Sequence, residues 1–543
     1  MSIRLDNLLA ASGRSERVLF VPPPSTTAPI PMKLGGAVPR GTGGGGPPCT
    51  SCGRRGHTAD RCWGCPSGSR DGRQNTSRSP QTGLPERKGG RNVPPLRHGG
   101  SVHRTYSHPS RLKADSNSGM GGGLGHRVAL RAGPVPSQCL AGRKNKVTTA
   151  SGLLPARSLD KLYNFAECAG LHLVLGFNAL QRNPDSSWNS SAAFSLLKYS
   201  AGRKYNISWE LGNEPNGYRS MVGQTVNSTQ LAKDYTMLRT LLQSVRYYSR
   251  AHLYGPNAGP PRKNAILLLD GFMKNAGSVV DAVTWQHYYM DSRVTKAEDF
   301  LKTRLLDTLT EQITKVLKVV NSHAPGKKVW LGGVGPAWAG GTNNLSDTYA
   351  AGFLWLNTLG VAAMHGIDVV LRHSFFDYGY THLVDQHFNP LPDYWFSLVF
   401  KRLVGPRVLA VRVAGLQRKP QPGRVIRDKL RIYAHCTSFH NHNYVKGSIT
   451  IYIINLHRSR KKIKLAGTLR NKTVHQYLLQ PYGTDGLHAR SVQLNGEKLL
   501  MVDNETFPEL KPQTLRAGRT IAMPPMTIGF YVIKNINAYA CRR

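Results

Sequence analysis

The chain has 543 residues and a formal net charge of +42 at pH 7, from 72 Lys and Arg against 30 Asp and Glu. This length allows two or three domains, and no run of about 18 apolar residues is present that would indicate a membrane-spanning segment. Residues 1–150 hold 23 basic and 6 acidic residues (net +17), and residues 151–543 hold 49 and 24 (net +25). So basic a folded region indicates an acidic partner: nucleic acid, anionic lipid or a sulfated polysaccharide. The alternative is a generally basic protein without a specific polyanion site.

Residues 1–150 are rich in Gly, Pro, Ser and Arg, and their apolar residues show no periodicity. Such a segment cannot bury enough apolar surface to offset the entropy lost on ordering, so we expect it to be disordered. Its first residues lack the apolar core of a secretory signal peptide.

A short part of this segment has the spacing of a metal site. Cys49, Cys52, His57 and Cys62 follow the pattern C-x2-C-x4-H-x4-C, which is typical of retroviral-type zinc knuckles. Three thiolates and one imidazole form a tetrahedral zinc site, and the basic and aromatic side chains around it suit single-stranded nucleic acid. The spacing therefore predicts zinc as a cofactor and nucleic acid as a partner here. The alternative is a chance cluster in a disordered tail.

From residue 151 onward, apolar strand-like runs alternate with amphipathic helical stretches such as 230–248 and 300–321. The predicted strands are 171–177, 207–211, 252–255, 282–287, 328–331 and 368–373. This alternation predicts a parallel sheet, and we assign residues 151–403 to an α/β domain of the (β/α)8 barrel type. Two further strands should precede residue 171, and nothing in residues 1–150 supplies them, so the barrel is expected to have an open edge.

After residue 404 the pattern becomes all-β, with Gly, Pro and Asn turns between short strands. The predicted strands are 407–413, 430–435, 448–455, 476–479, 492–494 and 527–533. They predict a β-sandwich over residues 404–543, packed against the barrel. Cys436 and Cys541 lie in this region, and we favour a disulfide between them over a pair of buried free thiols.

Six Asn-x-Ser/Thr sequons in residues 151–543 favour a secreted glycoprotein. They are Asn189, Asn206, Asn227, Asn344, Asn471 and Asn504.

The most informative local pattern is the sequence WELGNEPN at residues 209–216. Barrel enzymes carry their reacting groups at the carboxyl ends of strands, and Glu214 falls just past the predicted strand 207–211. Retaining glycosidases use two carboxyl groups about 5 Å apart, one a proton donor with a raised pKa and one a nucleophile. We therefore interpret Glu214 as a proton donor with Asn213 beside it, against the alternative of a solvated loop Glu. Glu210 lies within the strand and is expected to point elsewhere.

A second carboxylate is missing where the nucleophile should be. The strand 328–331 is followed by Gly332, Gly333, Val334 and Gly335, and no Asp or Glu occurs from Gln312 to Ser346.

Five collinear phrases give the chain a family resemblance. They are 205–216 (YNISWELGNEPN), 283–289 (VTWQHYY), 327–332 (KKVWLG), 345–353 (LSDTYAAGF) and 391–395 (LPDYW). Through them, residues from about 155 to the end resemble the heparanases of glycoside hydrolase family 79. The phrases HSFF (373–376), VRVAGLQRK (411–419) and INLHRSRKK (454–462) are similar to the branch regarded as non-hydrolytic. The resemblance does not extend over residues 1–150.

The resemblance implies an endo-β-glucuronidase fold that acts on heparan sulfate without a cofactor. It places the proton donor on Glu214 and the nucleophile on Gly333, which leaves the nucleophile position vacant. The substrate-binding positions that it implies are Asn213, Gln286, His287, Tyr288, Arg262 and Lys263, with Thr381 near a further contact. It also implies an extracellular location, in the matrix or at the cell surface.

Three hypotheses follow. In the first, the chain binds heparan sulfate and does not cut it. In the second, it is an active glycoside hydrolase that uses another carboxylate, such as Asp377 after the last predicted strand. In the third, it binds nucleic acid through residues 49–62. Two basic clusters are further candidate polysaccharide contacts or simply solvated turns: Arg418, Lys419, Arg424 and Arg427, and the run from Arg458 to Lys464.

Overall fold

The computed structural model describes residues 2–4, 125–129, 156–291, 296–376, 379–414, 429–438, 441 and 443–542. All of them belong to one compact unit, formed by Met1–Pro24 and Ser116–Arg543. Three predictions concern residues outside the described ranges: the zinc ligands Cys49, Cys52, His57 and Cys62, the carboxylate Asp377, and the basic cluster Arg418 to Arg427.

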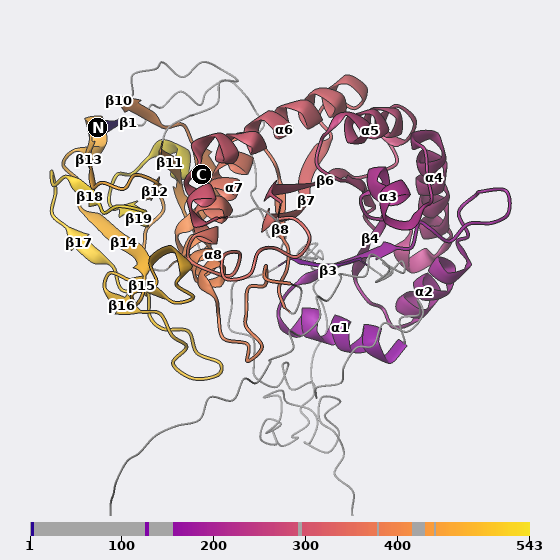
Figure 1. The fold of residues 1–543 in the computed structure, drawn as a ribbon, viewed down its shortest axis with the longest axis horizontal. Coiled ribbons are helices and arrows are strands. Elements are labelled where there is room, and N and C mark those ends of the chain that lie inside the picture. The colour runs from indigo at the N-terminus through magenta and orange to yellow at the C-terminus, as the bar shows by residue number, and fades with distance from the viewer. Residues whose placement is uncertain are drawn as a thin grey trace, which may run out of the picture. The chain divides into compact units, whose positions relative to one another are not determined.

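The first part is an α/β arrangement in which parallel strands alternate with helices (Figure 1). Its strands are β3 (His172–Phe177), β4 (Ile207–Leu211), β5 (Tyr254–Ala258), β6 (Ala282–Met290), β7 (Lys328–Ala337) and β8 (Val369–Arg372). Its helices are α1 (Ala156–Cys168), α2 (Ser191–Gly202), α3 (Tyr218–Val222), α4 (Ser228–Ser244), α5 (Lys263–Ala276), α6 (Thr303–His323), α7 (Ala351–Met364) and α8 (Pro392–Leu403).

The six strands pair in chain order. β3 pairs with β4, and β5 to β8 form a second parallel run, while a parallel bridge between Trp209 and Leu253 connects β4 to β5. Strand β2 (Gly125–Ala129) pairs antiparallel with β3, so the strand beside β3 does not have the direction that a (β/α)8 barrel requires. The closed eight-stranded barrel remains a prediction.

Helix α4 illustrates how the sequence produces these elements. Asn227 is its N-cap, and the Asn227 side chain accepts a hydrogen bond from the backbone N–H of Gln230 at 2.8 Å. Its buried residues repeat at helical spacing and pack toward the strands: Leu231, Tyr235, Leu238 and Leu242.

The strands also have a packed inner face. Inward side chains from five strands form a separate buried cluster: Val174, Tyr254, Ala282, Trp330, Val369 and Leu371. Because β3, β5, β6, β7 and β8 all contribute side chains to one small cluster, the sheet must curve around that cluster. The carboxyl ends of these strands therefore face a shared edge.

The second part is all-β and contains two sheets. The larger has the order β16-β15-β14-β19-β12-β11-β9, with β17 beside β14, and the smaller has the order β10-β1-β13-β18. The strands are β1 (Ser2–Arg4), β9 (Val404–Leu409), β10 (Arg412–Ala414), β11 (Leu430–Thr437), β12 (Ile449–Asn455), β13 (Lys461–Leu465), β14 (Val474–Pro481), β15 (Val492–Leu494), β16 (Glu497–Lys498), β17 (Gln513–Leu515), β18 (Ile521–Met523) and β19 (Thr527–Ile533).

Strand β12 shows how the larger sheet is buried on both faces. Ile451 and Ile453 pack with residues of the smaller sheet, whereas Tyr452 and Ile454 join the core that includes α7 and α8. This alternation is the two-residue period of a strand between two apolar layers.

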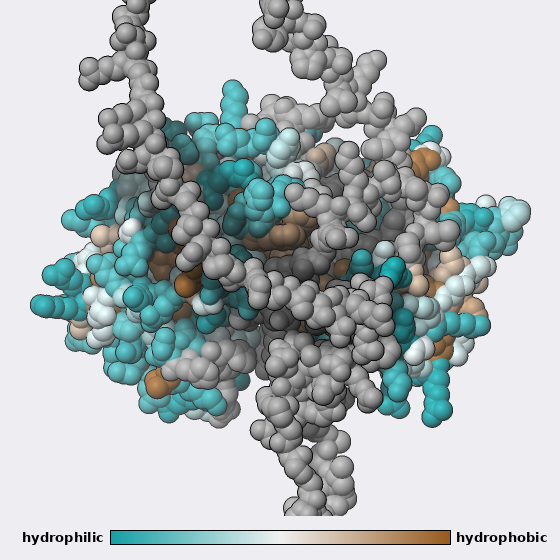
Figure 2. All heavy atoms as spheres, turned by 90° about the horizontal axis from the view of Figure 1, so that it is seen from below, coloured by the Kyte–Doolittle hydropathy of each residue, from teal (hydrophilic) through white to brown (hydrophobic). Residues whose placement is uncertain are grey.

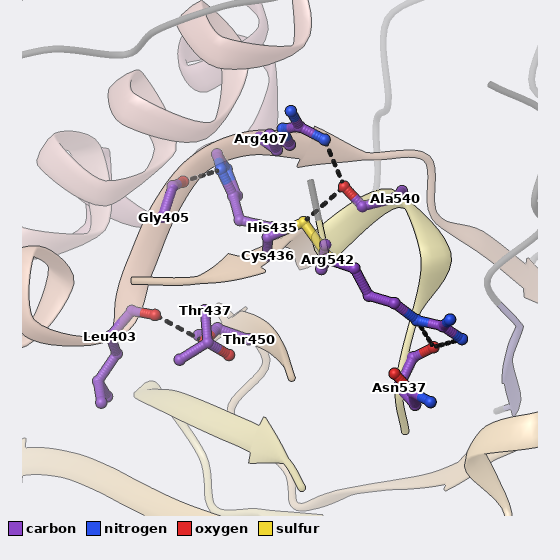
Figure 3. Close-up of a disulfide and its surroundings, with 11 residues drawn as sticks. Leu403, Gly405, Arg407, His435, Cys436, Thr437, Thr450, Asn537, Ala540 and Arg542 are labelled. Carbon is purple, nitrogen blue, oxygen red and sulfur yellow. Dashed lines mark hydrogen bonds between the residues drawn. A yellow bond between two sulfur atoms is a disulfide. The ribbon is translucent and has the colours of Figure 1, made fainter. Parts of the chain in front are cut away.

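A disulfide joins the end of β11 to the end of the chain (Figure 3). Cys436 is bonded to Cys541, which is 105 residues later, so the predicted bridge is confirmed. Around it, Arg407 donates a hydrogen bond to the carbonyl oxygen of Ala540 at 2.8 Å, and His435 Nδ1 lies 3.0 Å from the carbonyl oxygen of Gly405 (Figure 3).

The basic run from Arg458 to Lys464 is not only a turn. Its second half forms β13, in which Ile463 and Leu465 are buried while Lys462 and Lys464 are exposed. The predicted strand 407–413 is in fact two strands, β9 and β10, which belong to different sheets.

The described surface in Figure 2 is mostly hydrophilic, with apolar residues in scattered patches. Five sequon asparagines are exposed and the sixth, Asn189, is half-buried; the exposed ones are Asn206, Asn227, Asn344, Asn471 and Asn504. Among the described residues, none of the helices combines the length and apolarity needed to cross a membrane.

Candidate active site

Glu214 is held in place by its backbone. It follows β4 after the turn at Gly212 and adopts a left-handed conformation, with φ 48° and ψ 56°. Its N–H donates a hydrogen bond to the carbonyl oxygen of Asn257 at 3.0 Å, which fixes this loop against the end of β5. Left-handed backbone is uncommon for residues other than glycine, and such conformations concentrate at functional sites. Glu210, by contrast, is buried within β4.

The space beside Gly333, the vacant nucleophile position, is occupied by the side chain of Gln286. Gly333 of β7 is the direct neighbour of Gln286 of β6, just past an irregularity in the pairing. A Cβ atom placed on Gly333 would lie 2.9 Å from Oε1 and 3.2 Å from Cδ of Gln286. The space into which a side chain at residue 333 would grow is therefore filled by the Gln286 amide, which is only 5% exposed.

Gln286 is tied to its neighbours by hydrogen bonds. Its Nε2 donates to Oδ1 of Asn213 at 2.7 Å, and the hydroxyl of Tyr288 donates to its Oε1 at 3.2 Å. Oδ1 of Asn213 also accepts a hydrogen bond from Nδ2 of Asn257. The structure thus brings together the predicted residues Asn213, Gln286 and Tyr288, and adds Asn257, which the sequence analysis did not identify.

The backbone of Asn213 is fixed as well. Its N–H donates to the hydroxyl of Tyr218 at 3.1 Å. Burial of Tyr218 raises the pKa of its hydroxyl to about 12, so this group remains neutral at physiological pH.

His287, also predicted as a substrate contact, does not lie with Gln286 and Tyr288. Successive residues of a strand point to opposite faces, so His287 points away from Gln286 and Tyr288. It is fully buried against α6, where its Nδ1 lies 2.9 Å from Oε1 of Gln312. Burial lowers the pKa of the His287 imidazole to about 4, so the side chain is neutral and structural.

Arg262 and Lys263 lie at the same edge as Glu214, at the start of α5 directly after β5. Both are exposed, and the Arg262 side chain makes no capping hydrogen bond. The chain before them is held to the Glu214 loop, because the N–H of Gly259 donates to Oδ1 of Asn216 at 2.8 Å.

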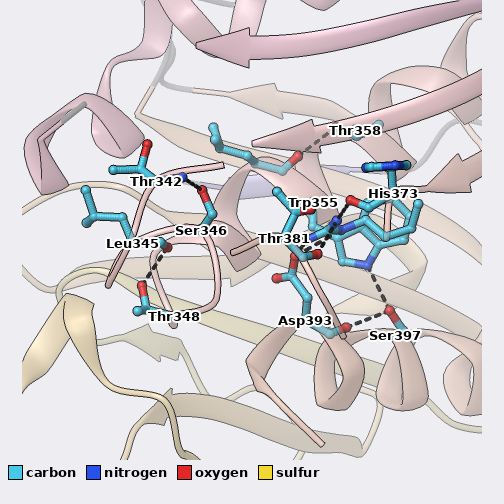
Figure 4. Close-up of polar contacts among 12 residues, drawn as sticks. Thr342, Leu345, Ser346, Thr348, Trp355, Thr358, His373, Thr381, Asp393 and Ser397 are labelled. Carbon is cyan, nitrogen blue, oxygen red and sulfur yellow. Dashed lines mark hydrogen bonds and ion pairs between the residues drawn. The ribbon is translucent and has the colours of Figure 1, made fainter. Parts of the chain in front are cut away.

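The end of β8 is fixed by a buried ion pair. Nη2 of Arg372 lies 2.8 Å from Oδ2 of Asp393 in α8, and Nη1 donates to the carbonyl oxygen of Thr381 at 2.9 Å. Both partners, Asp393 and Thr381, are labelled in Figure 4. Burial raises the pKa of the Asp393 carboxyl, although the neighbouring Arg372 lowers it. Thr381 is only 1% exposed, so its side chain faces the protein rather than the open edge.

The fit between Gly333 and Gln286 can be tested by Gly333→Glu. We expect it to lower the free energy of unfolding by about 2–4 kcal/mol, because it displaces Gln286 from its hydrogen bonds and buries a carboxylate. The double variant Gly333→Glu with Gln286→Ala should recover about 1 kcal/mol of this loss, because Gln286 no longer conflicts sterically with residue 333. Urea unfolding of the two variants measures both changes in the free energy of unfolding.

The matched control is Gly202→Glu, because a Cβ on Gly202 meets nothing within 4 Å. It should change stability by about 0.5 kcal/mol or less. A Gly333→Glu protein as stable as this control would contradict the packing described.

Comparisons with known proteins identify the relatives of this fold. Residues 114–360 match the model for "Glycosyl hydrolase family 79, N-terminal domain". The chain is 73% identical to the human protein "Inactive heparanase-2" over 395 residues, which cover 73% of this chain and 67% of that protein. It is 48% identical to mouse "Heparanase" over 384 residues, which cover 71% and 70%.

Among solved structures, an α-L-arabinofuranosidase from Thermotoga maritima superposes with a TM-score of 0.51 at 14% identity, over 69% of this chain and 78% of that one. This likeness supports a glycoside-hydrolase-like α/β fold. The matched sequences show that the chain belongs to glycosyl hydrolase family 79.

Proposed function

We propose that this chain binds heparan sulfate and does not hydrolyse it. The observation that carries the proposal is the Gly333–Gln286 contact. A retaining glycosidase needs a carboxylate within about 5 Å of its proton donor, and here an amide side chain fills the place where that carboxylate would begin. An amide cannot act as the nucleophile that forms a glycosyl-enzyme ester in this scheme.

The same edge of the sheet retains groups suited to a sulfated, carboxylated sugar. Glu214, Asn213 and Tyr288 offer hydrogen bonds, and Arg262 and Lys263 offer exposed positive charge at the start of a helix. Guanidinium groups bind sulfate-like oxygens in a bidentate manner, and a helix N-terminus favours anions. We therefore place the polysaccharide along this edge.

An extracellular location, in the matrix or at the cell surface, is part of the proposal. The Cys436–Cys541 disulfide is typical of oxidising compartments, and five of the six sequons are exposed for glycosylation.

The ligand can be tested on the full chain by heparin titration at several salt concentrations. Arg262→Gln with Lys263→Gln should weaken heparin binding about tenfold and reduce its salt dependence, because two cationic contacts to the anionic groups of heparin are removed. Arg246→Gln with Arg250→Gln is the matched control. It removes the same charge from exposed residues that precede β5, at the opposite edge of the sheet.

Chemically desulfated heparin should bind far more weakly than heparin to all three proteins. If the unmodified chain does not bind heparin at physiological salt, the proposed ligand is wrong. If the control pair loses as much affinity as the Arg262 and Lys263 pair, binding is only a consequence of net charge.

A further inference from the structure

A second basic site lies where the start of α6 meets the all-β part. It is a pocket of about 390 Å³, lined by Glu298, Leu301, Lys302, Thr303, Arg304, Lys429, Leu456 and Arg458. The residues come from three separate segments of the sequence: the turn before α6 with the first two residues of α6, the residue before β11, and the turn after β12.

The pocket has an excess of positive charge. Four of its lining side chains are cationic and one, Glu298, is acidic. Nζ of Lys302 lies 2.5 Å from Oδ1 of Asp299, so this cation is already paired. Arg304, Lys429 and Arg458 are exposed, and none of them forms an ion pair with another described residue. Three cationic side chains therefore line this pocket without an ion-pair partner among the described residues, which favours an anionic ligand.

The walls of the pocket are rigidly connected. Arg431 of β11 forms a buried ion pair with Asp307 of α6, with 2.6 Å between Nη1 and Oδ1, and its Nη2 donates to the carbonyl oxygen of Thr303 at 3.2 Å. The N–H of Leu456 donates to the carbonyl oxygen of Lys429 at 2.8 Å. These contacts fix the segments that carry Arg304, Lys429 and Arg458, so little ordering is needed when an anion binds.

The charge continues beyond the pocket. Arg458 leads through exposed Arg460 into β13, where Lys462 and Lys464 are exposed on one face, about 7 Å apart by strand geometry. The pocket also lies at the edge that carries Arg262, since α6 follows β6 as α5 follows β5. A pocket that opens onto a line of cations suits an extended polyanion better than a single small ion.

We propose that this pocket is a second binding site for the sulfated polysaccharide, in which Arg304, Lys429 and Arg458 hold a sulfate group of the chain. The inference rests on the ligand class of the proposed function and adds a site that shares no residue with the one around Glu214, Arg262 and Lys263. The vacant nucleophile position plays no part in it.

The test is heparin titration of the full chain carrying Arg304→Gln and Arg458→Gln. We expect affinity about tenfold lower than that of the unmodified chain and a reduced salt dependence, because two anion contacts are lost. The Arg246→Gln and Arg250→Gln chain, of equal net charge, should lose at most about twofold. Thermal unfolding of each protein verifies that the substitutions leave the fold intact.

Two further measurements assign the ligand. Combining the pocket pair with Arg262→Gln and Lys263→Gln should multiply the two losses, because both sites hold one chain. A single-stranded DNA of matched charge should show no selective loss with the pocket pair; a selective loss as large as that for heparin would overturn the assignment to a sulfated sugar.

The outcomes separate the two proposals. If the unmodified chain fails to bind heparin, the proposed function itself is wrong. If it binds heparin and the pocket pair behaves like the control pair, only the second site is wrong. The second site would also be wrong if the Arg304→Gln and Arg458→Gln chain lost binding of inorganic sulfate but kept its affinity for heparin. The pocket would then bind a free anion and not the polysaccharide.

Discussion

Heparan sulfate incubated with this chain should remain intact under conditions in which mouse heparanase degrades it. We expect a rate at least about 10⁴-fold lower, the scale on which loss of a member of a catalytic unit acts. The physical reason is that residues Gln312 to Ser346, which include all of β7, contain no Asp or Glu, and that Gln286 fills the space beside Gly333. Size analysis of end-labelled heparan sulfate fragments measures the rate.

Two variants decide whether any residual cleavage belongs to this site. Glu214→Gln removes the proposed proton donor, and Asp377→Asn removes the carboxylate that the second hypothesis requires. Both should leave the fragment pattern unchanged, because there is no cleavage for them to abolish. A rate within about 100-fold of heparanase that disappears in either variant would show that another carboxylate has taken over the nucleophile's role.

Removal of the disulfide should have the largest effect on stability. Cys436→Ala with Cys541→Ala opens a closed loop of 105 residues, for which chain entropy alone gives a loss of about 4–5 kcal/mol in the free energy of unfolding. The loss should be seen in the all-β part, because the bridge attaches the end of the chain to β11. Guanidinium unfolding under non-reducing conditions, followed by far-UV circular dichroism, measures it.

Cys168→Ala is the control for this experiment. Cys168 is an exposed free cysteine at the end of α1. Its replacement should change the free energy of unfolding by about 0.5 kcal/mol or less. If the double variant is as stable as Cys168→Ala, then the bridge does not hold the chain end and the β11 segment together.

Short strands flanked by turn residues could be predicted from sequence. β4, β15 and β19 have the bounds that their patterns predicted, because turn residues flank each run and tertiary contacts do not extend it. β7 was predicted only to Leu331, because Gly332, Gly333 and Pro336 have low strand propensity. It runs to Ala337 because Gly333, Val334, Gly335 and Ala337 pair with β6. The run that forms β13 was interpreted as a polysaccharide contact or a solvated turn, because its two buried residues alternate with lysines.

The candidate site was predicted in part. The local motif located Glu214 and Asn213, and the resemblance located Gln286 and Gly333. Their contact depends on the register between two strands whose paired residues lie 47 positions apart in the chain, with an irregularity just before the pair, and no local pattern encodes it. The burial of His287 could not be predicted for a similar reason, because the motif does not show which residues of β6 face the open edge.

The most direct test of the central claim is covalent labelling with a mechanism-based glucuronic acid epoxide, which esterifies the nucleophile of retaining β-glucuronidases. Intact-mass measurement of this chain should show no adduct after exposure that fully labels mouse heparanase, while heparin still binds. A stoichiometric adduct on any Asp or Glu of this chain would contradict the account, since it would identify an attacking carboxylate across from Glu214.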